Sequence, residues 1–372
     1  MPVVELGDIC EFLDHRRKPV SEEFRKSGPY PYYGANGQQG WIDRYIFDEP
    51  LVLLAEDGGH FGSTTKPIAY KISGKTWVNN HAHVLKPGPL CDIDYLTHAL
   101  SFYDVSKFIG GTTRPKLTKG NAEVIKLPLP DLPEQKRIAG QLEQADRLRR
   151  TRRYALELSD TFLPAAFVKL FGDPIRNLKH WPSIQLGDAC ERLTVGFVGS
   201  MVNEYCDSGI PFLRSLNVRR NVIAPSELKF VSETFHAKLS KSALRPGDVV
   251  SVRTGKPGVS AVIPEWIAES NCADLIVITV GRKLVPLFLA ELLNQRLGDV
   301  DHISGTTGAI QTHLNIERAR ELVIPLPPIG IQERFAEVVR RHQRLRANQS
   351  EARREADHIF RSLRHRTFGE NR

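Results

Sequence analysis

Two segments of the chain carry apolar or small side chains at a spacing of three and four residues, with charged side chains between them. The first contains Ile138, Ala145, Leu148, Ala155 and Phe162, and the second contains Phe335, Val338, Leu345, Ala352, Ala356, Ile359 and Leu363. This spacing predicts two helices that each present one apolar seam to a partner helix. Because the two seams share one register, we expect the helices to pair with each other. A helix of about 35 residues is about 50 Å long.

Three polar residues interrupt these seams, and one proline lies near the end of the first segment. Arg152, His342 and Gln349 occupy seam positions, where we expect them to fix the register of the pair at some cost in stability. Pro164 lacks a backbone N–H group, so we expect it to break the first helix there and let the chain turn into the next domain.

The rest of the chain forms two stretches, residues 3–127 and 183–324, that are rich in glycine, proline, aromatic and β-branched residues. Short apolar runs predict buried strands at residues 51–54, 248–252 and 275–278, and short helices at residues 96–102 and 287–292. A proline-rich segment then ends each stretch, because proline forces an extended backbone. These patterns predict two compact mixed domains, each followed by one long helix.

The two halves repeat one another. LGD at residues 6–8 recurs at 186–188, GTT at 111–113 recurs at 305–307, and PLP at 128–130 recurs at 325–327. The offset grows from 180 to 197 and then stays constant through both helices, so insertions lie in the second globular part. Matches in the same order along the chain predict an internal repeat.

The expected fold class is therefore α+β, with two mixed α/β domains separated by two long helices and related by a pseudo-twofold repeat. The expected boundaries are residues 1–130 for the first domain, 131–171 for the first helix, 172–327 for the second domain and 328–372 for the second helix.

The net charge of the chain indicates what kind of partner the protein binds. The chain carries +8 overall, which favours an anionic partner. Residues 134–170 have a net charge of +3 and residues 332–366 of +5, so the two predicted helices account for the whole excess. All ten cationic residues of the second helix are arginines, whose planar guanidinium groups suit paired contacts with carboxylates or phosphates. The helices therefore favour partner helices and DNA phosphates, although the solvated flanks of a coiled coil would carry the same pattern.

The sequence contains candidate catalytic and metal-binding motifs, but the residues around them do not support either role. Asp131 and Glu134 resemble a nuclease metal pair, but they flank a proline hinge rather than lie on a bent strand. His81 and His83 could share one face of a strand, as metal ligands do, but no third ligand follows at a sensible spacing. Five scattered cysteines without a CxxC pair predict neither a disulfide framework nor a zinc site. We expect no catalytic residue, no metal site and no cofactor in this chain.

The same features indicate where the protein works. The N-terminus lacks the lysines and apolar core of a signal peptide. No apolar run approaches the roughly 18 residues that a membrane span needs. We therefore expect a cytoplasmic protein of a prokaryote.

Several segments together resemble the specificity subunit family of type I restriction-modification enzymes. In the first half these are residues 31–40 (PYYGANGQQG), 56–59 (EDGG), 111–117 (GTTRPKL), 127–130 (LPLP) and 134–139 (EQKRIA). In the second half they are residues 245–249 (RPGDV), 305–307 (GTT) and 325–328 (PLPP). The second half departs from the family pattern at residues 331–333, where Ile-Gln-Glu stands in place of the usual Glu-Gln.

This resemblance implies a function and a set of partners. It implies two target-recognition domains at opposite ends of an antiparallel helix pair, which read the two parts of a bipartite, asymmetric DNA site without performing chemistry. It also implies two modification (methyltransferase) subunits that grip the helices and bind S-adenosylmethionine themselves, and optionally restriction subunits. A stand-alone DNA-binding regulator is the alternative.

Reading bases requires paired donors and acceptors, such as arginine or lysine for guanine and asparagine or glutamine for adenine. Candidates in the first domain are Tyr32, Tyr33, Asn36, Gln38, Gln39, Thr112, Thr113, Arg114 and Lys116. Candidates in the second domain are Arg214, Asn217, Arg219, Arg220, Arg253, Lys256, Thr306, Thr307, Gln311 and His313. We expect some of them to contact only phosphates, and both tyrosines to lie partly in the core.

Overall fold

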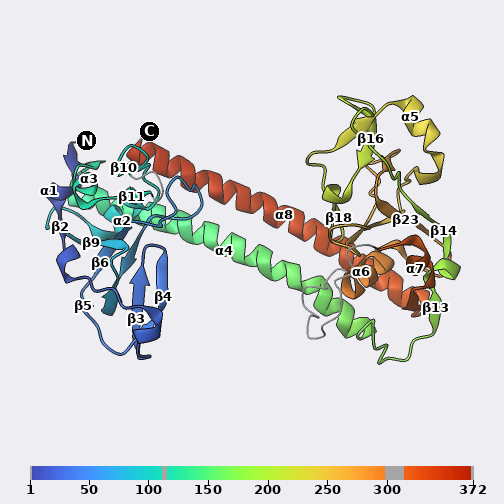
Figure 1. The fold of residues 1–372 in the computed structure, drawn as a ribbon, viewed down its shortest axis with the longest axis horizontal. Coiled ribbons are helices and arrows are strands. Elements are labelled where there is room, and N and C mark those ends of the chain that lie inside the picture. The colour runs from blue at the N-terminus through green and yellow to red at the C-terminus, as the bar shows by residue number, and fades with distance from the viewer. Residues whose placement is uncertain (1, 111–114, 298–313, 370–372) are drawn as a thin grey trace. The chain divides into compact units, whose positions relative to one another are not determined.

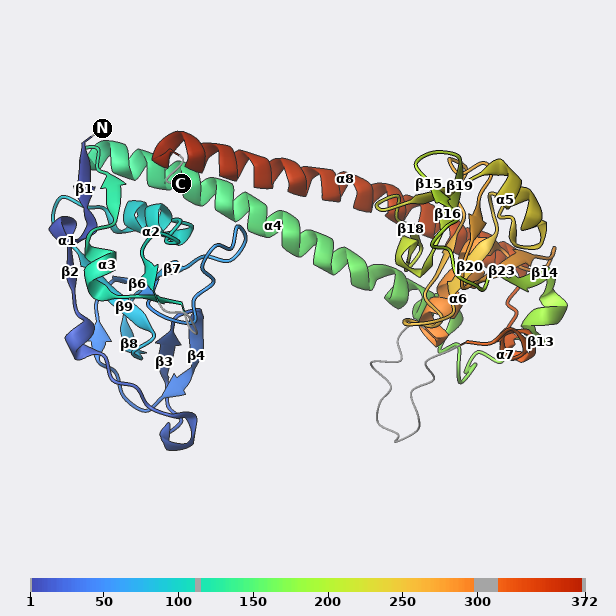
Figure 2. The ribbon, with the colours of Figure 1, turned by 45° about the horizontal axis from the view of Figure 1, so that its top comes forward.

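The computed structural model describes residues 2–110, 115–297 and 314–369. They form two compact units, each of which holds one globular part and a stretch of both long helices. The first unit contains residues 1–153 and 351–372, and the second contains residues 154–350. Figures 1 and 2 show the elements of each unit.

The first unit is built on two four-stranded sheets (Figure 1). One has the strand order β2-β9-β6-β7 and the other has the order β4-β3-β8-β5. Strand β6 is buried at every position, which fits its place between two neighbours. The strands are β1 (Val3–Glu5), β2 (Cys10–Phe12), β3 (Tyr30–Gly34), β4 (Gly37–Ile42), β5 (Phe47–Asp48), β6 (Leu51–Ala55), β7 (Ala69–Ile72), β8 (Lys75–Val78), β9 (Ala82–Pro87), β10 (Ile109–Gly110), β11 (Lys116–Leu117) and β12 (Lys126–Pro128).

Short helices cover the first of these sheets. They are α1 (Leu6–Ile9), α2 (Ile93–Ser101) and α3 (Lys119–Glu123). Asp92 begins α2 because its carboxylate accepts the N–H groups of Asp94 and Tyr95, which would otherwise lack partners at a helix start. Strand β1 pairs antiparallel with β12 and so joins the beginning of the unit to its end.

The second unit also contains two four-stranded sheets, and the first of them repeats the strand order found in the first unit. Its sheets have the orders β14-β23-β20-β21 and β15-β19-β16-β22. In both units the second sheet contains one parallel pair, β3 with β8 and β16 with β22. The strands are β13 (Ser183–Gln185), β14 (Cys190–Val195), β15 (Tyr205–Cys206), β16 (Ile210–Leu213), β17 (Val218–Arg219), β18 (Val222–Ile223), β19 (Lys229–Val231), β20 (Val249–Val252), β21 (Ser260–Val262), β22 (Asn271–Cys272), β23 (Leu275–Val280) and β24 (Val323–Pro325).

Its helices are α5 (Glu233–Lys238), α6 (Pro286–Arg296) and α7 (Ile316–Glu321). Pro286 is the first residue of α6, a position where the missing N–H group costs nothing. The strands expected at residues 51–54, 248–252 and 275–278 and the helices expected at residues 96–102 and 287–292 are confirmed as β6, β20, β23, α2 and α6. The chain is thus a mixed α/β protein with two long helices.

The long helices α4 (Leu132–Phe171) and α8 (Ile329–Phe368) are each 40 residues long. In the first unit the beginning of α4 packs against the end of α8, where Ile138, Leu142 and Phe360 share one core. In the second unit Phe167 near the end of α4 packs against Phe335 near the beginning of α8. The two helices therefore run antiparallel within each unit.

Two expectations about these helices are wrong. Pro164 does not break α4, which continues to Phe171. Proline removes one backbone hydrogen bond, but Leu163, Phe167 and Phe171 around it are buried in the core of the second unit, and this packing keeps the helix continuous.

The seam also departs from the expected heptad positions. Ile138, Ala145, Phe335 and Ala356 are buried as expected, but Leu148, Phe162, Leu345 and Ile359 are exposed. Neighbouring residues replace them, among them Leu142, Leu163, Val339 and Phe360. A straight α-helix drifts by about 20° per heptad from an exact seven-residue repeat, so the contact line moves to adjacent positions. Arg152 is exposed, whereas His342 is buried and lies 2.9 Å from the Ser159 hydroxyl group through its Nε2 atom.

One glutamine fastens each long helix to its unit in the same way. Gln135 is fully buried; its amide nitrogen donates to the carbonyl oxygens of Leu90 and Pro130, at 2.9 and 2.8 Å, and its Oε1 accepts the N–H group of Asp92 at 2.8 Å. Gln332 is also fully buried. Its amide nitrogen donates to Lys283 and Pro327, at 3.1 and 2.8 Å, and its Oε1 accepts from Val285 at 3.0 Å. We call this contact the glutamine latch.

Candidate nucleic-acid interface

Polar loops of the first unit meet beside strand β11. Asn36 in the β3–β4 turn donates to the carbonyl oxygen of Gly58 at 2.9 Å, and Gln39 accepts from the side chain of Asn79 at 3.0 Å. Leu117 of β11 donates its N–H group to Glu56 at 2.7 Å. These bonds hold three separate loops next to Lys116, at the edge of the segment that contains the expected Gly-Thr-Thr motif. Amide side chains and a lysine can contact both base edges and phosphates.

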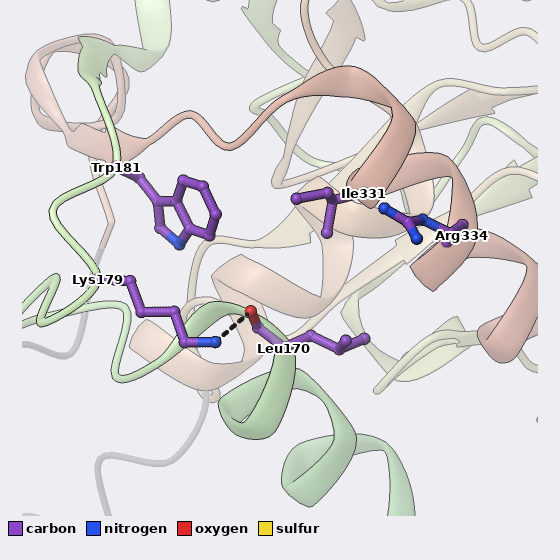
Figure 3. Close-up of a pocket in the computed structure, with 5 residues that line it drawn as sticks. All are labelled: Leu170, Lys179, Trp181, Ile331 and Arg334. Carbon is purple, nitrogen blue, oxygen red and sulfur yellow. Dashed lines mark hydrogen bonds between the residues drawn. The ribbon is translucent and has the colours of Figure 1, made fainter.

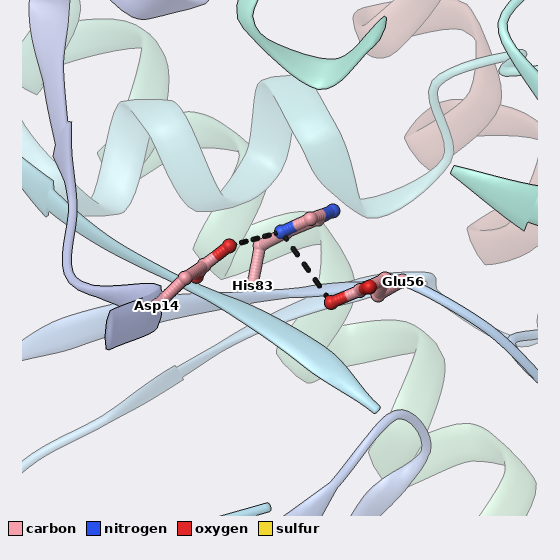
Figure 4. A group of neighbouring side chains, drawn as sticks. All are labelled: Asp14, Glu56 and His83. Atoms are coloured by element: carbon pink, nitrogen blue, oxygen red, sulfur yellow. Dashed lines mark hydrogen bonds and ion pairs between the residues drawn. The ribbon is translucent and has the colours of Figure 1, made fainter. Parts of the chain in front are cut away.

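A buried ionic cluster supports this edge (Figure 4). The His83 ring lies 2.6 Å from a carboxylate oxygen of Asp14 through Nδ1 and 2.8 Å from the carbonyl oxygen of Leu117 through Nε2. Both partners are hydrogen-bond acceptors, and the ring joins them. Arg17 and Lys116 reach Glu56 at 2.6 and 2.9 Å. The cluster therefore fastens β11 to strands β6 and β9.

Both carboxyl groups of the cluster have pKa values below the ordinary range. Burial alone would raise the pKa of Asp14, but its hydrogen bond to His83 and the charges of His83 and Arg17 outweigh burial and lower it. Burial likewise opposes ionisation of Glu56, and the hydrogen bonds from Arg17 and Lys116 outweigh it, so its pKa is lowered. Asp14, Glu56 and His83 lie close enough together to suit a metal ion. Arg17 and Lys116 already supply the positive charge that an ion would bring, which makes the cluster an ion-pair network.

The structure gives the predicted residues of the first unit different roles. Tyr32 is buried, its hydroxyl group contacts the backbone of Val20, and Arg25 stacks on its ring at 3.9 Å. Tyr32 is therefore a core residue, which corrects its assignment as a base-reading candidate. Tyr33 is half-buried against Tyr70, whereas Asn36, Gln38, Gln39 and Lys116 are exposed. Thr112, Thr113 and Arg114 lie outside the described residues.

In the second unit, the structure separates exposed candidates from supporting ones. Arg219 and Lys256 are exposed. Asn217 is fully buried; its oxygen accepts the Arg214 N–H group and its amide nitrogen donates to Ser226, so its assignment as a DNA-contacting residue is also corrected. A buried amide with backbone partners on both sides cannot turn toward DNA without leaving them unpaired.

The remaining arginines of this unit are partly engaged by the protein itself. Arg220 binds the buried carboxylate of Glu291 at 2.8 Å, Arg253 lies 3.4 Å from Asp274, and Arg214 donates to the carbonyl oxygen of Glu227. Thr306, Thr307, Gln311 and His313 lie outside the described residues.

The sequence reasoning missed the residues that support these surfaces. Asp14, Arg17 and Glu56 were not recognised as a group, and His83 was predicted, with His81, to be structural rather than a metal ligand, but without its partners. Asn221, Glu291 and Asn294 in the second unit were likewise missed. A weak signal existed, since a buried strand ends directly before Glu56 and a charged residue there needs partners.

A cavity of the second unit lies where α4 ends (Figure 3). It measures about 510 Å³ and is lined by Leu170, Lys179, Trp181, Ile331 and Arg334. Lys179 donates to the carbonyl oxygens of Lys169 and Leu170, at 3.0 and 2.8 Å, and so neutralises the unpaired C-terminal carbonyl groups of the helix. These contacts give the cavity a structural role at the helix end. None of the helices in the described part of the chain is long and apolar enough to cross a membrane.

Comparison with known proteins gives a consistent result. The model of the type I restriction-modification DNA specificity domain matches residues 1–158. A type I restriction enzyme specificity subunit of Haemophilus influenzae is 35% identical over 133 residues, which cover 36% of this chain and 34% of that relative. A specificity subunit of Methanocaldococcus jannaschii is 24% identical over 90% of this chain and 84% of its own length. The first of these matches thus spans about a third of the relative's length.

Solved structures share the fold. The crystal structure of a type I restriction-modification S subunit from M. genitalium covers 99% of this chain and 96% of its own, with a TM-score of 0.63 and 14% identity. A structure described under complex assembly and conformational transition of the type I restriction-modification system covers 100% and 98%, with a TM-score of 0.57 and 17% identity.

Proposed function

We propose that the chain is a member of the specificity subunit family of type I restriction-modification enzymes, whose DNA specificity domain matches residues 1–158, and that it is the non-catalytic subunit through which such an enzyme recognises its DNA sequence. The observation that carries the proposal is the duplicated plan. One four-stranded sheet of each unit has the same strand order, β2-β9-β6-β7 and β14-β23-β20-β21, and both units have the same glutamine latch to a long helix. Each unit also presents exposed amide or cationic side chains on loops beyond its strands, namely Asn36, Gln38 and Gln39 in one and Arg219 and Lys256 in the other.

Two different reading units in one chain suit a bipartite, asymmetric site. The loop residues of the two units differ, so the two half-sites need not be related. We propose that the first half-site is read by the domain of residues 1–130 and the second by the domain of residues 172–327, with α4 and α8 forming an antiparallel spacer between them. The duplicated plan supports a pseudo-twofold relation between the two halves of the chain.

The helices also offer a surface for partner proteins. Tyr154, Leu158 and Phe162 lie at intervals of four residues along α4 and are all more than half exposed. Residues at that spacing share one face of a helix, and an exposed apolar stripe of this kind is typical of a docking surface. We propose that modification (methyltransferase) subunits dock on the helices, two per chain, and supply S-adenosylmethionine and the catalytic residues. Restriction subunits can join the same complex, which would act on the DNA in the cytoplasm.

The decisive experiment is to map methylated adenines in the genome with and without this gene, while the partner methyltransferase is expressed. Loss of methylation at one bipartite motif is the expected result. An unchanged methylation pattern would contradict the proposal. Tight sequence-specific binding by the isolated chain, with no change in methylation, would instead indicate a stand-alone regulator.

A further inference from the structure

A hairpin of the second unit docks on a network of buried polar side chains. Strands β17 and β18 pair Val218 with Ile223 and Arg219 with Val222, which leaves Arg220 and Asn221 as the turn. Between β16 and β20 the second unit contains β17, β18 and β19, whereas between β3 and β6 the first unit contains β4 and β5. The hairpin is therefore part of what distinguishes the second unit from the first.

Asn221 fixes the turn through every polar atom that it has. Its N–H group donates to Ser260 at 2.9 Å, and its side-chain oxygen accepts from Asn294 at 3.1 Å. Its side-chain nitrogen donates to Glu291, and its carbonyl oxygen accepts from Gln343 of α8 at 2.8 Å. Its φ of 59° is in the left-handed region, which asparagine tolerates better than most residues. Strand β21, helix α6 and helix α8 thus all hold this one residue.

Glu291 is the charged centre of the network. Its side chain is completely buried on α6. One carboxylate oxygen lies 2.8 Å from the Arg220 guanidinium group and 2.8 Å from the Gln295 amide, and the other accepts from Asn221. Both residues of the hairpin turn are therefore bound to one carboxylate.

In the first unit, helix α2 packs on strand β7 as α6 packs on β21, but α2 has no carboxylate at the position of Glu291. Counting from the residues that the two latches bind, Asp92 and Val285, His98 of α2 corresponds to Glu291 and Ser101 corresponds to Asn294. Ser101 donates to Ala69 at the start of β7, as Asn294 donates to Ser260 at the start of β21.

In the first unit, the counterparts of the residues that hold the hairpin line an open groove. It measures about 730 Å³, and Ala69, His98 and Ser101 are among the residues that line it. Packing of the helix on the sheet therefore does not require Glu291. A buried charge is costly relative to an apolar residue. The contacts that Glu291 makes outside its own helix are those to Arg220 and Asn221 of the hairpin.

We propose that Glu291 is a positioning residue for DNA recognition by the second unit. It holds Arg220 and Asn221 so that Arg219, which is exposed on the adjacent strand position, contacts a base of the second half-site. The hydrogen bond from Asn221 to Ser260 also sets the hairpin beside the β20–β21 turn, where exposed Lys256 follows Arg253. This inference rests on the proposed function, since it assumes that the second unit reads DNA.

The test uses the complete complex with its methyltransferase partner and a library of randomised DNA sites, whose methylated members are sequenced. Arg219→Ala removes the contact itself and should reduce discrimination at one or two base positions by about 5- to 150-fold, the range for a lost bidentate base contact. Glu291→Gln should reduce discrimination at the same positions by about tenfold and leave the other half-site unchanged. Agreement between the affected positions is the readout that a general loss of stability would not produce.

Two further variants keep the result interpretable. The double variant Arg220→Met/Glu291→Leu removes both charges together, so it leaves no unpaired charge in the core. It should still fold, with a melting temperature lowered by loss of the hydrogen bond from Asn221 to Glu291, and it should lose discrimination at the same positions. His98→Gln alters the corresponding site of the first unit and should leave those positions unchanged.

The outcomes separate the inference from the proposed function. Unchanged base preferences in Glu291→Gln and in the double variant, or in Arg219→Ala, would overturn the role of Glu291. A wild-type complex without any sequence preference would overturn the proposed function itself.

Discussion

Replacing Gln135 with alanine should destabilise the first unit and leave the second unaffected. The variant loses three hydrogen bonds and leaves the Asp92 N–H group and the carbonyl oxygens of Leu90 and Pro130 without the partner that they have in a fully buried site. A buried polar group that loses its partner costs about 1–3 kcal/mol. Three such groups give a loss of at least about 3 kcal/mol, a large share of the 5–15 kcal/mol that usually stabilises a domain.

Hydrogen exchange measured by mass spectrometry is the suitable assay, because it reports on each unit separately, whereas a single unfolding curve would combine two units. Backbone amides of β6 and β9 should exchange at least about 100-fold faster in Gln135→Ala, since 1.4 kcal/mol corresponds to a factor of ten. Amides of β20 and β23 should keep their protection. Gln332→Ala should give the opposite pattern.

Gln144→Ala is the matched control, because Gln144 lies on the same helix with an exposed side chain. It should change exchange in neither unit. If Gln135→Ala accelerated exchange in β6 and β9 by less than about fivefold, corresponding to about 1 kcal/mol, the latch would not hold the unit together and the reasoning would be refuted.

Three further predictions concern the ionic cluster, the helix surface and the spacer. The folded-state pKa values of Asp14 and Glu56 are lowered, so the stability that they contribute is complete above their ordinary values near 4 and is lost as the pH falls through the lowered values. Urea unfolding of the wild type should therefore lose this contribution as the pH falls below about 4, and Asp14→Asn should show a smaller loss over the same range. Phe162→Asp should weaken binding of the methyltransferase subunit at least about tenfold in analytical ultracentrifugation, whereas the exposed neighbour Thr161→Asp should bind normally; equal binding by both variants would exclude this stripe as the docking surface. Insertion of two helical turns after Leu148 should lengthen or abolish the spacer between half-sites in the methylated motif, and any change within the half-sites themselves would contradict the spacer role.

The long helices and the repeat could be predicted from the sequence because both follow from patterns among residues that are close together in the chain or at a constant offset. A 3,4 spacing and a constant offset of 197 need no knowledge of distant contacts. The exact positions of the seam were harder to predict, since the buried residues Leu163 and Phe360 lie one position after the expected Phe162 and Ile359. That difference depends on how far a straight helix drifts from a heptad repeat, which is decided by packing along its whole length.

The residues of the candidate interface could be predicted only in part, for a different reason. Asn36 and Arg219 could be recognised as polar loop residues, and both are exposed. Tyr32 and Asn217 have equally suitable side chains but are buried, and their partners lie elsewhere in the fold. The supporting clusters were missed because they join residues far apart in the chain, such as Asp14 and His83. Their pairing follows from strand order, which local patterns do not specify.

The glutamine latch has a consequence for how such proteins change over evolutionary time. Each latch contacts only main-chain atoms of its unit: the oxygen of Leu90 and the nitrogen of Asp92 in one, and the oxygen of Lys283 and the nitrogen of Val285 in the other. Side chains at those positions can therefore vary without disturbing the joint. A different globular domain that offers the same main-chain groups could therefore be joined to an unchanged long helix, so a domain can be exchanged as a whole rather than adjusted one residue at a time.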